Sequence, residues 1–405
     1  MSLIVQKFGG TSVQDINHIR HVAQRVIETK KQGHDVVVVL SAMAGETNRL
    51  IKLAHEANPD PDSREYDQLI STGEQVTIAL LALCLQSLGQ PARSFLGHQV
   101  KILTNSVHSR AKIQSIDATR IFETLKQNCV VIVAGFQGSD EAGNITTLGR
   151  GGSDTTAVAI AAALKANLCE IYTDVDGVYT TDPRICSDAK KLDKISFDEM
   201  MELASQGAQV LQMRSVVFAA KYGVKLVVRS SFNKNEGTLI CKEDKPMEDV
   251  VVSGITLDEG EAKLALRRLP DRPGVASRIF LPVAKAGINV DMIVQNISAD
   301  GFTDLTFTVP SNVLKETRKL IEKVGSEVGF DKIEADEDIA KVSIVGVGMR
   351  SHSGVAAKVF ETLSQNKINI EMISTSEIRI SVVVKKDFGK KAVMALHKAF
   401  DMAQV

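Results

Sequence analysis

The feature that most constrains the fold of this chain is an internal repeat in its C-terminal part. Residues 273–293 align without gaps with residues 353–373, and eight of the 21 aligned positions are identical. Each copy has the pattern of a strand, a turn opened by glycine, a helix, an Ile-Asn turn and a second strand. A repeat of this size indicates two related modules. We expect them at residues 250–332 and 338–405, each with an α+β fold.

Residues 1–245 follow a different pattern, in which short apolar runs alternate with amphipathic stretches. A run of aliphatic residues such as Val36 to Leu40 is typical of a strand that is buried on both faces. Strands that alternate with helices predict a mostly parallel central sheet between helices, the α/β class. The expected strands are residues 3–8, 36–40, 130–134, 170–173 and 225–228. The expected helices are residues 16–31, 66–88 and 155–166.

Composition excludes several functional classes. The net charge of −1 gives no basic field for nucleic acid, and the aromatic content of 4% argues against base stacking. The five cysteines form no C-x-x-C pair, so neither a disulfide framework nor a metal site is predicted. We find no signal peptide and no run of about 18 apolar residues, so a cytoplasmic protein without a membrane span is expected.

Two loops that follow predicted strands carry small and hydroxyl residues. Lys7 and the Gly9-Gly10 turn come directly after the first strand and precede a helix, where backbone N–H groups can approach a phosphate. The loop from Ser41 to Thr47 follows the second strand, where open α/β sheets bind ligands. Either loop alone could be an ordinary strand-to-helix turn.

Two further segments offer charged groups. Arg150 lies among three glycines, and Ser153 or Asp154 can cap the Ala-rich helix that follows. A guanidinium in that setting suits a carboxylate or phosphate clamp. Glu74, at or within a helix, could hold an ammonium group, although a solvated helix glutamate is the commoner case.

The segment from Thr173 to Arg184 follows another buried strand and offers groups for a nucleoside and its phosphates. A different kind of nucleotide site is excluded, because the G-x-x-x-x-G-K-[ST] pattern of P-loop enzymes does not occur. Asp387-Phe388-Gly389 spells a protein-kinase tripeptide, but its companion motifs do not occur, so it is expected to start the last helix.

Together, these segments resemble the aspartate kinases of the amino-acid kinase family, and the repeat resembles the paired, ferredoxin-like ACT modules of the same enzymes. The resemblance implies transfer of a phosphoryl group from ATP to L-aspartate, which gives ADP and 4-phospho-L-aspartate. Mg²⁺ would be bound through the nucleotide phosphates. This reaction begins lysine, threonine and methionine biosynthesis. A carboxylate has a reference pKa of about 4 and is already a nucleophile at neutral pH, so no general base is required.

The resemblance also implies roles for individual residues. Glu74 would bind the ammonium group of aspartate, Arg150 its α-carboxylate, and Asp154 would organise the phosphate-binding lysines. The implied nucleotide-binding residues are Lys7, Gly9, Gly10, Ser41, Thr173, Asp174, Tyr179, Arg184 and Gln209. The implied aspartate-binding residues are Ser41, Thr47, Glu74, Arg150, Gly151, Gly152, Ser153 and Asp154. The implied catalytic residues are Lys7, Asp154 and Gln209.

The chain departs from the family pattern at Gln209, where the family has a second phosphate-binding lysine. Lys190, Lys194 or Arg214 could supply a cation instead. One alternative is therefore a catalytically weak or silent amino-acid sensor on the kinase fold. A second is another member of the family, such as a glutamate or acetylglutamate kinase. Thr47, Glu74 and the tandem repeat argue against that second reading.

For the modules, the resemblance implies binding of lysine and threonine as effectors and assembly of a homo-oligomer. A sheet that serves only dimerisation remains the alternative. Met247 could also start a short regulatory subunit. The implied effector contacts are Asp271, Gly274, Ala276, Asn289, Val290, Asp291 and Gln295 in the first module, and Val355, Ala356, Asn369, Ile370, Ser376 and Glu377 in the second.

Overall fold

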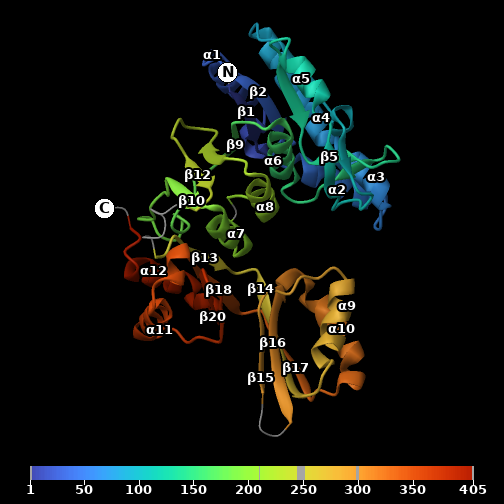
Figure 1. Cartoon of the computed structure of the whole chain (residues 1–405). Helices are drawn as coiled ribbons and strands as arrows, with labels where there is room; N and C mark the ends of the chain where they lie inside the picture. Colours follow the sequence, from blue (N-terminus) through green and yellow to red (C-terminus); the bar gives the residue numbers. More distant parts are fainter. Residues whose placement is uncertain (1, 209, 244–250, 298–300, 404–405) are drawn as a thin grey trace. The chain divides into compact units, whose positions relative to one another are not determined.

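The computed structural model describes residues 2–208, 210–243, 251–297 and 301–403, which form two compact units. The N-terminal unit comprises Met1–Val178, Lys191–Ser205 and Gln209–Met247. The C-terminal unit comprises Tyr179–Lys190, Gln206–Ala208 and Glu248–Val405. Two short segments of the expected catalytic region, 179–190 and 206–208, therefore belong to the C-terminal unit (Figure 1).

The N-terminal unit is built on an eight-stranded sheet with the order β10-β12-β11-β9-β1-β2-β6-β3. Every neighbouring pair is parallel except β11 and β12. This confirms the predicted α/β class and each predicted strand. The strands are β1 (Leu3–Phe8), β2 (Asp35–Leu40), β3 (Ala92–Phe95), β6 (Val130–Ala134), β9 (Leu168–Thr173), β10 (Lys194–Ser196), β11 (Leu226–Ser230) and β12 (Thr238–Cys241).

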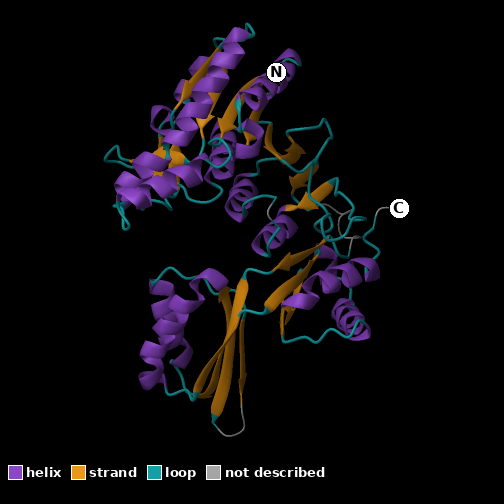
Figure 2. Cartoon of the chain, turned by 180° about the vertical axis from the view of Figure 1, so that it is seen from behind, coloured by secondary structure: helices purple, strands orange, loops and turns teal. Residues whose placement is uncertain are grey.

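Helices cover the central strands of this sheet, as Figure 2 shows. Helices α1 (Ile16–Lys31) and α4 (Thr72–Ser87) share a core with alternate residues of β2 and β6, such as Val38 and Ile132. The intervening Val37 and Val39 are also fully buried. Helix α6 (Gly152–Leu164) packs against β1, β2 and β9 and is itself almost entirely buried. The other helices are α2 (Glu46–Ala57), α3 (Ser63–Ile70), α5 (Thr119–Leu125), α7 (Phe197–Ser205) and α8 (Met213–Tyr222).

The single helix predicted at residues 66–88 is wrong in one respect, because α3 and α4 are separate helices that meet at Ser71. The hydroxyl groups at the junction bond back to the end of α3: Ser71 Oγ donates to the Gln68 carbonyl and Thr72 Oγ1 to the Leu69 carbonyl. Taken together, Ser63–Ser87 are long and apolar enough to match a membrane span, but 56% of the matching window is buried inside the protein. That burial is typical of a core helix.

A second, smaller sheet in the N-terminal unit has the order β5-β4-β7-β8. Its strands are β4 (Ile102–Thr104), β5 (Ile113–Ile116), β7 (Gln137–Ser139) and β8 (Ile145–Thr147). Strand β8 leads directly into the Gly149–Gly152 loop and helix α6. The small sheet therefore fixes the approach of the chain to the predicted arginine loop.

The C-terminal unit contains two antiparallel four-stranded sheets, and each is covered by two helices. The first sheet has the order β15-β16-β14-β17 and the second β13-β18-β20-β19. This confirms the two predicted α+β modules. The first module comprises β14 (Glu261–Pro270), α9 (Val275–Lys285), β15 (Ile293–Ile297), β16 (Phe302–Pro310), α10 (Leu314–Val328) and β17 (Lys332–Asp336). The second comprises β18 (Ile339–Val345), α11 (Val355–Gln365), β19 (Met372–Thr375), β20 (Arg379–Lys385) and α12 (Gly389–Ala399).

The sheets do not follow the module boundaries expected from the repeat. Strand β13 (Gly254–Asp258) precedes the first module in sequence, but it pairs with β18 of the second. It takes the edge position that β17 holds in the first sheet. Among the described residues no strand follows α12, and the second sheet is completed by β13, which precedes the first module in the sequence.

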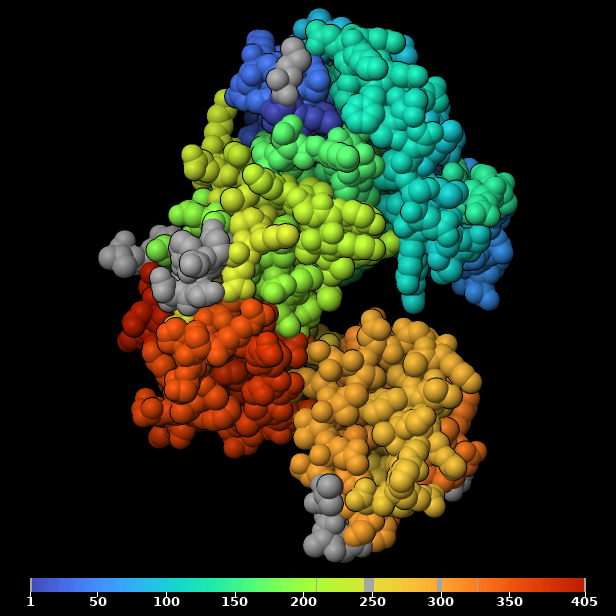
Figure 3. Space-filling view, in the orientation of Figure 1, coloured from blue at the N-terminus to red at the C-terminus, as the bar shows by residue number. Residues whose placement is uncertain are grey.

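The first module is coloured orange and the second red in Figure 3. Two ion pairs join these modules. Lys263 of β14 pairs with Glu371 of the second module, and Lys341 of β18 pairs with Asp291 of the first. Asp291 and Glu371 are equivalent positions of the repeat. We call these four residues the module seam. The seam places unlike charges together, including the almost fully buried Lys341.

Candidate functional site

The candidate site lies at the C-terminal ends of four adjacent parallel strands, β9, β1, β2 and β6. Backbone hydrogen bonds connect the loops that leave these strands. Gly9 N donates to the Tyr172 carbonyl at 3.2 Å, and Ser41 N donates to the Phe8 carbonyl at 3.2 Å. Carboxyl ends of parallel strands are where open α/β sheets bind ligands. The structure thus brings the predicted Lys7, Gly9-Gly10 and Ser41 segments to one edge.

Close packing explains why small residues occupy this edge. A Cβ atom at Gly10 would lie 3.0 Å from the Ala42 carbonyl oxygen, and one at Gly73 would lie 2.8 Å from Ala42 Cβ. One at Gly135, after β6, would lie 2.7 Å from Ser153 Oγ. The loops can approach one another only because these positions carry no side chain. Ser153, in the first turn of α6, is therefore packed against the end of β6.

Lys7 and Asp154 form an ion pair at the centre of the edge. Lys7 Nζ lies 2.6 Å from Asp154 Oδ1, and the two side chains are 11% and 10% exposed. Lys7 is the penultimate residue of β1, and Asp154 lies in the first turn of α6. Asp154 therefore holds the ammonium group of Lys7 beside the Gly9 turn. This arrangement agrees with a role for Asp154 in positioning a phosphate-binding lysine rather than in accepting a proton.

Glu74 is a buried carboxyl group with unused bonding capacity. It lies in the first turn of α4 and is only 3% exposed. Ala42 N donates a hydrogen bond to Oε1 at 3.1 Å, whereas Oε2 is buried without a hydrogen-bond partner. Burial raises the pKa of Glu74 to about 8. A buried carboxylate oxygen without a partner is costly unless a cation meets it, which makes Glu74 suited to an ammonium group.

Arg150 is exposed in the loop before α6. Within the described part of the chain, no carboxylate pairs with its guanidinium, so it is free to bind an anion. The flanking glycines are required by the backbone. Gly151 has a φ of 71°, and a Cβ atom there would lie 2.0 Å from Gln212 Cγ. The loop that carries Arg150 thus has a fixed path.

A residue that sequence analysis missed, Asp67 of α3, holds this loop. Its carboxylate is fully buried. It accepts hydrogen bonds from Thr147 N at 2.8 Å and Thr147 Oγ1 at 2.6 Å. It also accepts from Ser109 N at 2.9 Å, and His108 Nδ1 lies 3.1 Å away. Asp67 therefore anchors the end of β8, three residues before Arg150. A lone aspartate in a helix gives no sequence signal for such a role.

Arg214 of α8 braces the same loop. Its guanidinium donates to the Leu148 carbonyl at 2.8 Å and to the Ala111 carbonyl at 2.7 Å. Burial lowers the pKa of Arg214 from its ordinary value. These bonds occupy the guanidinium, so Arg214 does not serve as the replacement cation that its sequence position suggested. Gln209 itself lies outside the described residues, as does Met247.

The structure does not bring all predicted nucleotide residues into one unit. Thr173 and Asp174 follow β9 in the N-terminal unit, where Thr173 Oγ1 donates to Asp174 Oδ1 at 3.0 Å. Tyr179 and Arg184 belong to the C-terminal unit. Tyr179 packs against the core of the second module, and Arg184 lies 2.7 Å from Asp182. Of the remaining candidates, Thr47 is half-buried in α2, and Gly152 is buried in the first turn of α6.

In the first module, four predicted effector residues surround one pocket of about 90 Å³. The four residues are Asp271, Gly274, Ala276 and Gln295, and the pocket lies beside the N-terminus of α9. Arg272 and Thr303 also line it. Gly274 begins that helix with a φ of 91°. The helix N-terminus and the side-chain amide offer partners for an amino-acid carboxylate.

The other predicted effector residues have different surroundings. Asp291 pairs with Lys341 in the module seam. Val290, Val355, Ala356 and Ile370 pack against module cores. Four more are exposed or engaged with neighbours: Asn289, Asn369, Ser376 and Glu377. Glu377 lies 3.6 Å from Arg350, and Ser376 N donates to the Arg379 carbonyl.

Comparison with known proteins agrees with this geometry. Residues 2–230 match the amino acid kinase family, and residues 265–326 and 342–400 each match an ACT domain. An aspartate kinase of Stutzerimonas stutzeri is 56% identical over 403 residues, which cover 99% of this chain and 98% of the relative. An aspartokinase of Helicobacter pylori is 53% identical over 406 residues, which cover 99% and 100%.

Solved structures of aspartokinases also match this chain. The structure of E. coli aspartokinase III in complex with aspartate and ADP matches with a TM-score of 0.84 at 28% identity. That match covers 98% of this chain and 99% of the other. The E. coli structure in complex with lysine and aspartate matches with a TM-score of 0.79. The chain therefore belongs to the aspartate kinases of the amino acid kinase family, phosphotransferases with a carboxyl group as acceptor, and carries two ACT domains.

Proposed function

We propose that this chain transfers the γ-phosphoryl group of ATP to the side-chain carboxylate of L-aspartate, which gives ADP and 4-phospho-L-aspartate. The observation that carries this proposal is the buried Oε2 of Glu74, which has no hydrogen-bond partner. It lies at the sheet edge that also holds Lys7. An ammonium group would satisfy this oxygen and would favour the charged form of Glu74.

Two contacts orient the substrate. Glu74 binds the α-ammonium group of aspartate, and the guanidinium of Arg150 binds the α-carboxylate as a bidentate partner. The side-chain carboxylate then remains free to attack phosphorus. Because it is ionised at neutral pH, no residue has to remove a proton from it. Asp67 and Arg214 contribute indirectly, since they fix the path of the Arg150 loop.

Electrostatic stabilisation of the transferring phosphoryl group falls mainly to Lys7. Asp154 holds its ammonium group beside the Gly9-Gly10 turn. Mg²⁺ bound through the nucleotide phosphates would supply further positive charge. Thr173 and Asp174 are proposed nucleotide contacts, with Tyr179, Arg184 and Gln209 as further candidates from the resemblance. The silent-sensor alternative is not favoured, because relatives more than 50% identical over the full chain are named aspartate kinases.

We further propose feedback inhibition by lysine, threonine or both through the ACT modules. The pocket at Asp271, Gly274 and Gln295 supports this, since it offers polar partners for an amino acid. Inhibition requires two states that the effector binds unequally. A cytoplasmic homo-oligomer formed through the modules, and a short regulatory subunit that begins near Met247, remain proposals from the resemblance. The same holds for a place at the start of lysine, threonine and methionine biosynthesis.

The test of the proposed function is ADP release with ATP, Mg²⁺ and L-aspartate, with and without lysine and threonine. We expect aspartate-dependent turnover that either or both amino acids reduce. N-acetylglutamate and L-glutamate serve as control acceptors. Turnover in Gln209→Lys but not in the parent chain would make the chain an impaired kinase. Absence of turnover in both, with lysine or threonine still bound, would restore the sensor interpretation.

A further inference from the structure

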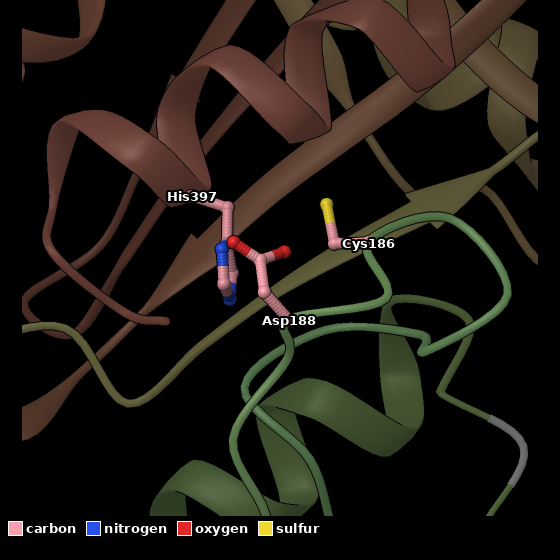
Figure 4. A group of neighbouring side chains, drawn as sticks. All are labelled: Cys186, Asp188 and His397. Atoms are coloured by element: carbon pink, nitrogen blue, oxygen red, sulfur yellow. The ribbon is translucent and has the colours of Figure 1, made fainter. Parts of the chain in front are cut away.

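Three metal-binding side chains from distant parts of the sequence meet in the C-terminal unit. Cys186 and Asp188 lie on the loop that follows Asp182, and His397 lies in the last turn of α12 (Figure 4). Their donor atoms all lie within 4.8 Å of one another. Cys186 and His397 are 5% and 1% exposed, whereas Asp188 is exposed. Two of the three side chains are therefore buried, and the third is exposed to solvent.

One ring nitrogen of His397 takes part in a hydrogen bond with a neighbouring hydroxyl group. Nε2 lies 2.9 Å from Thr180 Oγ1, and that hydroxyl donates to the Met402 carbonyl at 3.3 Å and accepts from Lys190 N at 3.0 Å. A hydroxyl has only one proton, and the Met402 carbonyl can only accept. With the Thr180 hydroxyl donating to the Met402 carbonyl, Nε2 of His397 is the donor to Thr180, which leaves a lone pair on Nδ1.

Thr180 thus acts as an outer partner that fixes the ring orientation and tautomer of His397. Metal-bound histidines commonly donate their second ring N–H to such a partner. The nitrogen lone pair, the carboxylate of Asp188 and the sulfur of Cys186 then converge.

We propose that Cys186, Asp188 and His397 bind one divalent cation of the zinc class. Sulfur, imidazole nitrogen and one carboxylate oxygen are the ligands that zinc takes, and three protein ligands leave a fourth position for water. Binding releases the thiol proton to solvent and forms a metal–thiolate bond, so one proton is released for each ion. The spacing of the cysteines could not predict this site, because two of its three ligands are not cysteines.

Such an ion would link the 182–190 loop to α12, the last helix of the second module. That loop already meets the segment after α12 through an isolated β-bridge between Ala189 and Ala403. The ion would add a second connection at the same place. The proposal concerns only the C-terminal unit, so it does not depend on the phosphoryl-transfer chemistry.

The test is Co²⁺ titration of the full-length chain after treatment with a chelator. A Co²⁺–thiolate bond gives a charge-transfer absorption band in the near ultraviolet, which reports the thiolate ligand directly. We expect one Co²⁺ per chain, with that band, and displacement of Co²⁺ by Zn²⁺. Cys186→Ser should abolish the band. Asp188→Asn, at an exposed position, should fold normally and weaken Co²⁺ binding at least about tenfold.

Cys241→Ser is the matched control, because Cys241 is a half-buried thiol in the N-terminal unit. It should keep the band and the affinity of the parent chain. A second variant tests the role of Thr180 as the hydrogen-bond partner of His397. Thr180→Val should weaken Co²⁺ binding by about 10–100-fold, while the thiolate band persists at saturation. The proposal is overturned if the parent chain shows no thiolate band at stoichiometric Co²⁺. It is equally overturned if the band survives in Cys186→Ser or if Asp188→Asn binds Co²⁺ unchanged.

Discussion

The two units differ in how their charged side chains are paired. At the sheet edge of the N-terminal unit, Glu74 keeps a buried oxygen without a hydrogen-bond partner, and Arg150 forms no ion pair with the described residues. At the module seam of the C-terminal unit, Lys263 and Lys341 each pair with an acidic residue of the other module. Groups that the fold leaves without a partner at this edge indicate a place for a ligand beside the Lys7–Asp154 pair, whereas the ion pairs of the module seam join two parts of the fold.

Glu261, near the module seam, is an instructive exception. One of its carboxylate oxygens is buried without a hydrogen-bond partner. Burial raises its pKa to about 7, although nearby Lys341 lowers it. A carboxyl group with that pKa can remain buried in its neutral, protonated form. An unpaired buried acid therefore indicates a ligand site only when other groups for the same ligand lie beside it.

The largest effect is expected at Lys7. Lys7→Met removes the cation at the phosphate position, and we expect kcat to fall by about 10²–10³-fold. Steady-state ADP release measures this. Lys101→Met is the matched control, because Lys101 also pairs with an aspartate at 2.9 Å but is exposed. The assignment is wrong if both variants keep the parent kcat.

The raised pKa of Glu74 makes aspartate binding depend on pH. Below pH 8 the carboxyl group holds a proton that it must lose before it can bind an ammonium group. Affinity for aspartate should therefore rise with pH up to about 8, by at most about tenfold per pH unit. Calorimetric titration between pH 6 and pH 8 measures it, with ADP as the control ligand. A pH-independent aspartate affinity would exclude the proposed pairing.

Asp67→Asn tests whether a buried and fully paired acid can still affect the site. We expect KM for aspartate to rise about tenfold, since the end of β8 loses an anchor before Arg150. KM for ATP should change less than about twofold. Asp60→Asn, at an exposed position nearby, is the control. Equal effects on both KM values would show that Asp67 supports the fold in general and not the arginine loop.

These residues also show where prediction from sequence succeeds. Consecutive aliphatic residues located β1, β2 and β6, and glycines marked the loops that approach closely, because both signals are local. Asp67 gave no signal, since its partners at Ser109 and Thr147 lie 42 and 80 residues away. Likewise, the repeat predicted two modules but not that β13 completes the second sheet. The repeat pattern contains no information on which edge strand pairs with which sheet.

The smallest effect is expected at the module seam. A double-mutant cycle on Lys263→Gln and Glu371→Gln should give a coupling free energy of about 1 kcal/mol in unfolding. Kinase activity without effectors should remain unchanged. The exposed pair Arg318 and Glu322 on α10 is the control, with about 0.3–0.5 kcal/mol expected. Coupling at the seam no larger than at the control would remove the contrast between the two units.

The most direct test of the central claim, that Glu74 receives the ammonium group of aspartate, compares aspartate with succinate. Succinate lacks only that ammonium group. We predict that the parent chain binds aspartate at least about tenfold more tightly than succinate at pH 8, and that Glu74→Gln binds both with similar affinity. Glu56→Gln, an exposed position on α2, should behave as the parent chain. If Glu74→Gln retains the full preference for aspartate, the ammonium group is bound elsewhere and the account of the site is wrong.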